Sequence, residues 1–125
     1  MSKKKIIVFL LFTLLIFLID RITKNYILNI AENEGSVDIF INSFLSLILV
    51  WNSGIGFGLL SFDQSIAYNL ISALIVFINL LIIYMIIKSN NLTSYFLIMV
   101  LGGSLGNLFD RIYYSAVPDF IDINY

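Results

Sequence analysis

Apolar residues fill three long stretches of the chain, and shorter polar segments separate them. About 20 helical residues, each rising 1.5 Å, span the roughly 30 Å hydrocarbon core of a bilayer. Each apolar stretch reaches that length, so the pattern predicts three membrane-crossing helices. They cover approximately residues 6–27, 66–87 and 92–112.

The first stretch begins like a secretory signal peptide, because three lysines precede an apolar run. That run ends in Asp20-Arg21 without the small residues that mark a cleavage site, and apolar residues then resume through Ile30. We therefore interpret it as an uncleaved first transmembrane helix. The third stretch contains the small residues of "GGSLGN" at 102–107, which allow another helix to approach closely.

The segment at about 36–62, between the first two helices, has a different pattern. It begins polar, is interrupted by glycines, and contains "VDIFINSFLSLILVW", which is rich in β-branched and aromatic residues. "NSGIGFG" follows as a turn signal. We predict an all-α membrane protein that forms a single multi-pass domain over 1–125, with a small β-element at 36–62 on the outer face.

Composition supports the membrane assignment and restricts the chemistry. The chain has 60% hydrophobic and 12% charged residues, whereas soluble domains average roughly 45–50% apolar. It has no cysteine and no histidine, so it lacks the commonest general base and the usual soft metal ligands. Any reaction must use carboxylates, lysine, hydroxyls or tyrosine, and we expect no metal. A net charge of -1 gives no basic surface for nucleic acid.

The basic residues predict the orientation, because lysine and arginine concentrate on the cytoplasmic side of membrane proteins. Four of the seven lie at the N-terminus and after the second helix, which places the N-terminus in the cytoplasm. The other three lie close to acids at the opposite ends of the first and third helices. These are Arg21, Lys24 and Arg111.

Charged groups within membrane helices persist where they pair, face water or perform a function. Asp20 and Lys24 stand four residues apart and share a helix face, which predicts a structural ion pair. Asn107 and Asp110 are three apart and can face one site. Asp110-Arg111 alone favours an ion pair at the helix end, but the nearby "VPDFID" brings further carboxylates and favours a reaction site.

Four motifs occur in an order that resembles the signal peptidase II family, the lipoprotein signal peptidases of bacterial cytoplasmic membranes. The resemblance covers essentially the whole chain. The motifs are Asp20-x-x-x-Lys24, Asn52-x-Gly54-x-x-Phe57-Gly58, Gly103-x-x-Gly106-Asn107-x-x-Asp110-Arg111 and Val117-x-Asp119-Phe120.

The resemblance implies an aspartyl protease that cuts a prolipoprotein just before its diacylglyceryl-modified cysteine, near the outer face of the membrane, without a metal or organic cofactor. Its partners would be the prolipoprotein and membrane lipid. Asp119 would be one catalytic acid. Substrate-binding or structural roles would fall to Asn52, Gly54, Asn107, Asp110, Arg111, Asp20 and Lys24.

One part of the family pattern is absent. The family's second catalytic aspartate belongs to an Asn-x-Ala-Asp run at the start of a fourth transmembrane helix, and this sequence contains no such run. Carboxylate-driven hydrolysis needs two acids, one acting as base and one donating a proton. We therefore expect a truncated copy without the fourth helix, with Asp110 and Asp122 as candidate substitutes for the missing acid.

Two other interpretations stay open. A small transport or binding subunit could use the intramembrane charges Asp20, Lys24, Asp110 and Arg111 to line a path for an ion or substrate. A structural fragment without activity follows if these 125 residues are all that is made. The order and spacing of the four motifs favour the enzyme.

Overall fold

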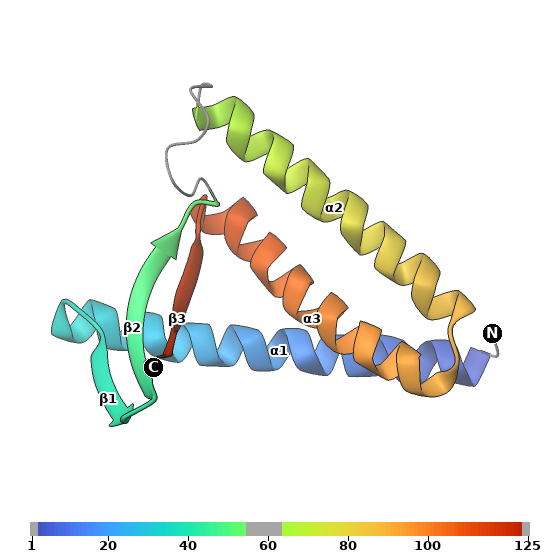
Figure 1. Cartoon of the computed structure of the whole chain (residues 1–125), viewed down its shortest axis with the longest axis horizontal. Coiled ribbons are helices and arrows are strands. Elements are labelled where there is room, and N and C mark those ends of the chain that lie inside the picture. The colour runs from blue at the N-terminus through green and yellow to red at the C-terminus, as the bar shows by residue number, and fades with distance from the viewer. Residues whose placement is uncertain (1–2, 55–63, 124–125) are drawn as a thin grey trace.

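The computed structural model describes residues 3–54 and 64–123, which form three helices and one sheet (Figure 1). This confirms the predicted class, a helical membrane fold with a small β-element. The helices are α1 (Lys3–Glu34), α2 (Gln64–Lys88) and α3 (Asn91–Tyr114). The strands are β1 (Asp38–Asn42), β2 (Leu45–Asn52) and β3 (Val117–Ile123).

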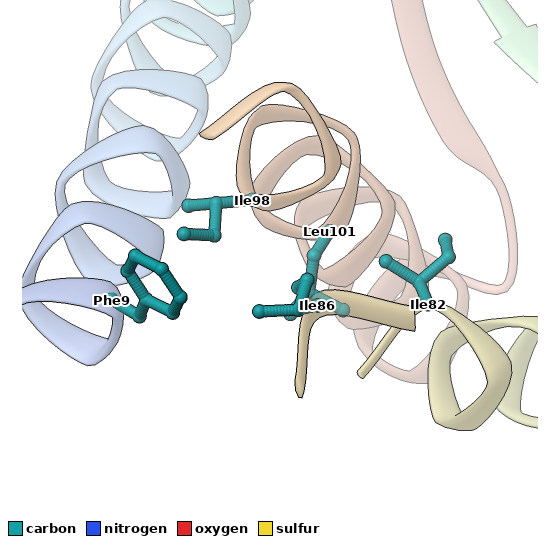
Figure 2. Close-up of a cluster of buried hydrophobic side chains, with 5 residues drawn as sticks. All are labelled: Phe9, Ile82, Ile86, Ile98 and Leu101. Carbon is teal, nitrogen blue, oxygen red and sulfur yellow. The ribbon is translucent and has the colours of Figure 1, made fainter. Parts of the chain in front are cut away.

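All three helices are long and apolar enough to cross a membrane. Helix α3 packs against both α1 and α2, whereas α1 and α2 diverge from a common end (Figure 1). A small apolar core joins the helices where they converge (Figure 2). It consists of Phe9, Ile82, Ile86, Ile98 and Leu101.

Helix α1 is longer than the predicted 6–27 because the polar segment after Ile27 stays helical. It ends at Gly35, whose φ of 79° is left-handed and whose N–H donates to Ala31 O at 2.9 Å. Glycine adopts this conformation without steric cost, so it terminates the helix. The extra turns carry α1 past the apolar stretch to the level of the sheet.

The sheet is antiparallel with the order β1-β2-β3. The sequence predicted only the part within 36–62, so the third strand is an addition to that prediction. β3 comes from the segment after α3 and pairs with β2, which places Val50 opposite Asp119 and Asn52 opposite Val117. This pairing brings together two motifs that are more than sixty residues apart. Phe57 and Gly58 of the second motif lie outside the described residues.

Glycines permit the close packing of α3 on α1. A Cβ built on Gly102 would lie 2.6 Å from Ile16 Cβ and 3.2 Å from Thr13 O. A Cβ on Gly106 would collide with the Asp20 carboxylate. The small residues therefore set the distance between these helices and allow their polar side chains to meet.

We expect Gly102→Ala to destabilise the fold by about 1–3 kcal/mol, the usual cost of overpacking. Gly103→Ala is the matched control, since a Cβ there meets nothing within 4 Å. It should be neutral or stabilising by about 0.5–1 kcal/mol, because alanine favours a helix over glycine. Thermal unfolding in detergent measures both, and equal losses for the two variants would contradict this packing.

Candidate active site

A buried carboxylate on α3 binds two cations of α1. Asp110 is completely buried, with 0% of its surface exposed. Arg21 Nη1 donates to its Oδ1 at 2.5 Å, and Lys24 Nζ donates to its Oδ2 at 2.6 Å. Both carboxylate oxygens are therefore engaged, and the interaction joins the two helices.

Asp20 completes this network from α1. Its Oδ2 accepts from Arg21 Nη2 at 2.7 Å, and its Oδ1 lies 3.0 Å from Lys24 Nζ. The ion pair predicted between Asp20 and Lys24 is thus present. Two anions and two cations sum to zero charge, which lowers the cost of placing them at the end of membrane helices.

Arg21 is a site residue that the motifs did not identify. Besides its two carboxylate partners, its guanidinium lies 4.8 Å from the Phe109 ring centroid and donates to Gly106 O at 3.3 Å. The sequence did contain a signal for this role. Burying a charged arginine in an apolar stretch costs free energy, so the arginine beside Asp20 requires partners. The sequence did not show that these partners lie on α3.

Arg111 does not form the helix-end ion pair with Asp110 that this couple, taken alone, favoured. Its Nη1 instead donates to Ser53 O at 3.1 Å. Consecutive helical residues point about 100° apart, so Asp110 faces α1 while Arg111 faces the end of β2. A Cβ on Gly54 would lie 2.7 Å from Arg111 Nη1, and Gly54 also has a left-handed φ of 80°. Arg111 thus holds the turn that follows β2, and that turn requires glycine.

Asn107 and Asp110 converge on one ammonium group, in agreement with their shared helix face. Lys24 Nζ donates to Asn107 Oδ1 at 2.7 Å as well as to Asp110. Asp110 is sealed from solvent, whereas Asn107 lines an open cavity. The network therefore extends from the helix interface to an accessible surface.

Asp119 lies on β3 and is exposed. Asn52 Nδ2 donates to its Oδ2 at 2.9 Å, and Asn52 Oδ1 accepts from Gly54 N at 2.7 Å. The second bond fixes the orientation of the carboxamide, so its NH₂ group must face Asp119. Within residues 3–54 and 64–123, none of the ion pairs includes Asp119. Unlike Asp110, Asp119 is reached by solvent.

Asp119 lines a cavity of about 440 Å³ together with Asp20, Lys24 and Asn107 of the ion-pair network. The cavity lies where α1, α3 and β3 meet. It is lined by Asp20, Thr23, Lys24, Asn107, Pro118, Asp119, Phe120 and Ile121. It therefore combines an acid, an amide and an ammonium group with apolar walls.

Neither candidate substitute for the second acid faces Asp119. Asp110 is buried and both of its oxygens bind cations. Asp122 is three positions farther along β3, and successive side chains of a strand alternate between its faces. It therefore points to the other side of the sheet from Asp119, and neither residue is placed to share a proton with it.

Comparisons with known proteins agree on one family. The family model described as "Signal peptidase (SPase) II" matches residues 12–125. The lipoprotein signal peptidase of Pelagibacter ubique is 52% identical over 116 residues, which cover 93% of this chain and 70% of that protein. The corresponding protein of Wigglesworthia glossinidia brevipalpis is 42% identical over 113 residues, 86% of this chain and 70% of that one.

Solved structures show the same fold. A bacterial membrane enzyme superimposes with a TM-score of 0.71 at 24% identity, over 94% of this chain and 70% of that one. A second structure described in the same words gives the same TM-score over 93% of this chain. The family model and the curated relatives show that the chain belongs to the signal peptidase II family.

Proposed function

We propose that this protein is a membrane-embedded aspartyl endopeptidase that cleaves the signal peptide of a diacylglyceryl-modified prolipoprotein just before the lipidated cysteine. The observation that carries the proposal is the contrast between its acids. Asp20 and Asp110 are neutralised by cations, whereas Asp119 is exposed in a cavity with its carboxylate held by Asn52. An exposed carboxylate of this kind can take a proton from the water molecule that attacks a peptide bond.

In the proposed reaction Asp119 acts as general base and removes a proton from water. The hydroxide attacks the peptide carbonyl carbon while a second, protonated acid donates to the carbonyl oxygen. The intermediate then collapses: Asp119 gives its proton to the leaving amine, and the former carbonyl oxygen returns its proton to the second acid. One carboxylic acid and one amine form per water consumed, and both acids return to their starting states. The family resemblance assigns the second acid to the Asn-x-Ala-Asp run, so the activity tests use a protein that carries that segment. We propose that residues 1–125 alone do not turn over substrate.

The position of the cavity supports the proposed substrate class. It opens at the ends of helices whose side chains are largely exposed and apolar, such as Leu14 and Ile22 of α1. A lipidated peptide can therefore reach Asp119 while its acyl chains stay in the bilayer. Matched precursors with and without the diacylglyceryl group test this in membranes that contain the protein. We expect cleavage of the lipidated precursor only, and equal cleavage of both would contradict the substrate assignment.

We propose that the protein lies in the bacterial cytoplasmic membrane with its N-terminus in the cytoplasm and the cavity at the outer face. The N-terminus and the turn between α2 and α3 lie together at one end of the helices, and the sheet lies at the other (Figure 1). This arrangement supports the orientation predicted from Lys3 to Lys5 and Lys88.

The absence of cysteine from the sequence makes this topology easy to test. We expect a Glu34→Cys variant to react with a membrane-impermeant maleimide in intact spheroplasts. A Ser89→Cys variant should react only after the membrane is permeabilised, because it lies at the opposite end of the helices. The reverse pattern would invert the proposed orientation.

Asn52 is expected to contribute to the rate through its bond to Asp119. Hydrogen bonds to charged groups contribute roughly 1.5–3 kcal/mol, so Asn52→Ala should lower kcat by roughly tenfold to a hundredfold. Asn33→Ala is the matched control, since Asn33 is exposed and bonds only within α1. An Asn52→Ala variant with unchanged kcat would show that this bond has no part in the reaction.

The transport interpretation receives no support from the charge network. A conduction path needs groups that can release and accept an ion, but Asp110 is sealed with both oxygens bound to cations. Arg111 points away from it to Ser53. Lys24 and Asp110 join α1 to α3, Asp20 pairs with Lys24, and Arg111 binds Ser53 O, so each of the four charges is engaged in a structural contact.

A further inference from the structure

The end of the β1–β2 hairpin carries large apolar side chains that the rest of the described chain leaves uncovered. Phe40 is 72% exposed, Ile41 49% and Phe44 70%. In Figure 1 both strands are oriented transverse to α1, and the turn that joins them lies on the side of α1 opposite α2 and α3. This hairpin end, defined as Phe40 to Phe44, thus forms an apolar projection to one side of the protein.

The hairpin end also lacks charge. No Asp, Glu, Lys or Arg occurs from Ile39 to Phe62. β1 is an edge strand, and exposed edges in water usually carry charged residues that prevent aggregation. The uncharged, aromatic hairpin end is therefore better suited to contact with lipid or protein than to contact with water.

The exposed side chains gather where the strand pairing is irregular. The pairing of β1 with β2 shifts register between Phe40 and Asn42, Ile41 lies at that irregularity, and Phe44 lies in the turn. A bulge of this kind disrupts the regular edge that a strand of a protein partner would need for pairing. An uncharged apolar end without a regular edge therefore favours lipid.

The helices place this hairpin at the edge of the hydrocarbon layer. Helix α1 has 32 residues and is about 48 Å long, which exceeds the roughly 30 Å hydrocarbon core. The sheet meets α1 where its apolar stretch ends, since Ile121 of β3 shares a cavity with Thr23 and Lys24. Strands that cross α1 at this level run along the membrane surface.

We propose that the hairpin end inserts into the boundary between headgroups and acyl chains of the bilayer that the protein's own helices cross. Aromatic and aliphatic side chains favour this layer. The insertion fixes the height of the sheet and therefore of Asp119 on β3. The proposal concerns membrane depth and does not depend on the proposed peptidase activity.

The lone tryptophan of the sequence allows a direct test. In a Trp51→Phe background, Phe44→Trp places one fluorophore at the hairpin end. The protein is reconstituted in phosphatidylcholine vesicles whose acyl chains carry bromine near the ester end or near the methyl end. Glu34→Trp serves as the aqueous reference and Leu14→Trp as the deep reference, both in the same background.

We expect a blue-shifted emission for Phe44→Trp, strong quenching by the shallow bromines, and weaker quenching by the deep ones and by aqueous acrylamide. Phe40→Trp should give the same pattern and serves as the second variant. Acrylamide quenching equal to that of Glu34→Trp would overturn the proposal. So would deep quenching equal to that of Leu14→Trp, or protection found in native membranes but not in pure lipid vesicles, which would indicate a protein partner.

Discussion

Asp119→Asn is expected to abolish cleavage while leaving the fold intact. General acid–base catalysis contributes roughly a hundredfold to ten-thousandfold, and asparagine cannot take a proton from water. The variant should fold because Asp119 is exposed and forms no ion pair within the described residues. Cleavage of a lipidated precursor and the thermal midpoint, measured on the same preparation, test both expectations.

Asp122→Asn is the matched control for this variant. It makes the same chemical change three residues farther along β3, on the other face of the strand. We expect it to retain activity. An active Asp119→Asn variant would remove Asp119 from the reaction. Equal inactivation of both variants would instead indicate a general effect on the strand.

Asp110→Asn is expected to have the largest effect on stability. The substitution leaves Arg21 and Lys24 in place and removes the only charge that both share across the α1–α3 interface in the described network. Removing one member of a buried ion pair costs about 3–5 kcal/mol, and here Asp20 would be left to balance two buried cations with a single charge. Unfolding in detergent, monitored by circular dichroism, measures the loss.

Asp38→Asn provides the comparison, since Asp38 is an exposed strand residue. We expect a change within about 0.5 kcal/mol, as is usual for surface substitutions. A double variant that adds Lys24→Met to Asp110→Asn should recover part of the loss, because it leaves one cation, Arg21, balanced by Asp20. A loss no larger than that of Asp38→Asn would show that the network does not stabilise the helix interface.

The helices could be predicted because their cause is local. An apolar run of about 20 residues leaves the chain few alternatives in a bilayer, since every backbone polar group must bond within its own helix. The Asp20–Lys24 pair and the shared face of Asn107 and Asp110 follow from helical spacing alone. Helical periodicity thus specified which polar residues belong together within one helix.

The remaining features depend on contacts between distant segments. β3 exists because β2 offers an edge for pairing, and nothing within the "VPDFID" segment shows which strand it will join. The partners of Arg21 and Arg111 depend on which elements lie next to each helix face. Spacing along the chain predicted the candidates, but only the packing of α1 on α3 shows that Asp110 is bound by cations while Asp119 is not.

We propose that Asp119 and a second acid hydrolyse the peptide with water alone. This proposal is tested most directly by incubating membranes that contain the protein with a lipidated precursor, with and without strong chelators, and locating the cut by mass spectrometry. We predict an unchanged rate, a cut immediately before the lipidated cysteine, and no product from the Asp119→Asn variant. Loss of cleavage on chelation, or an unaffected Asp119→Asn variant, would contradict metal-independent hydrolysis by these two acids.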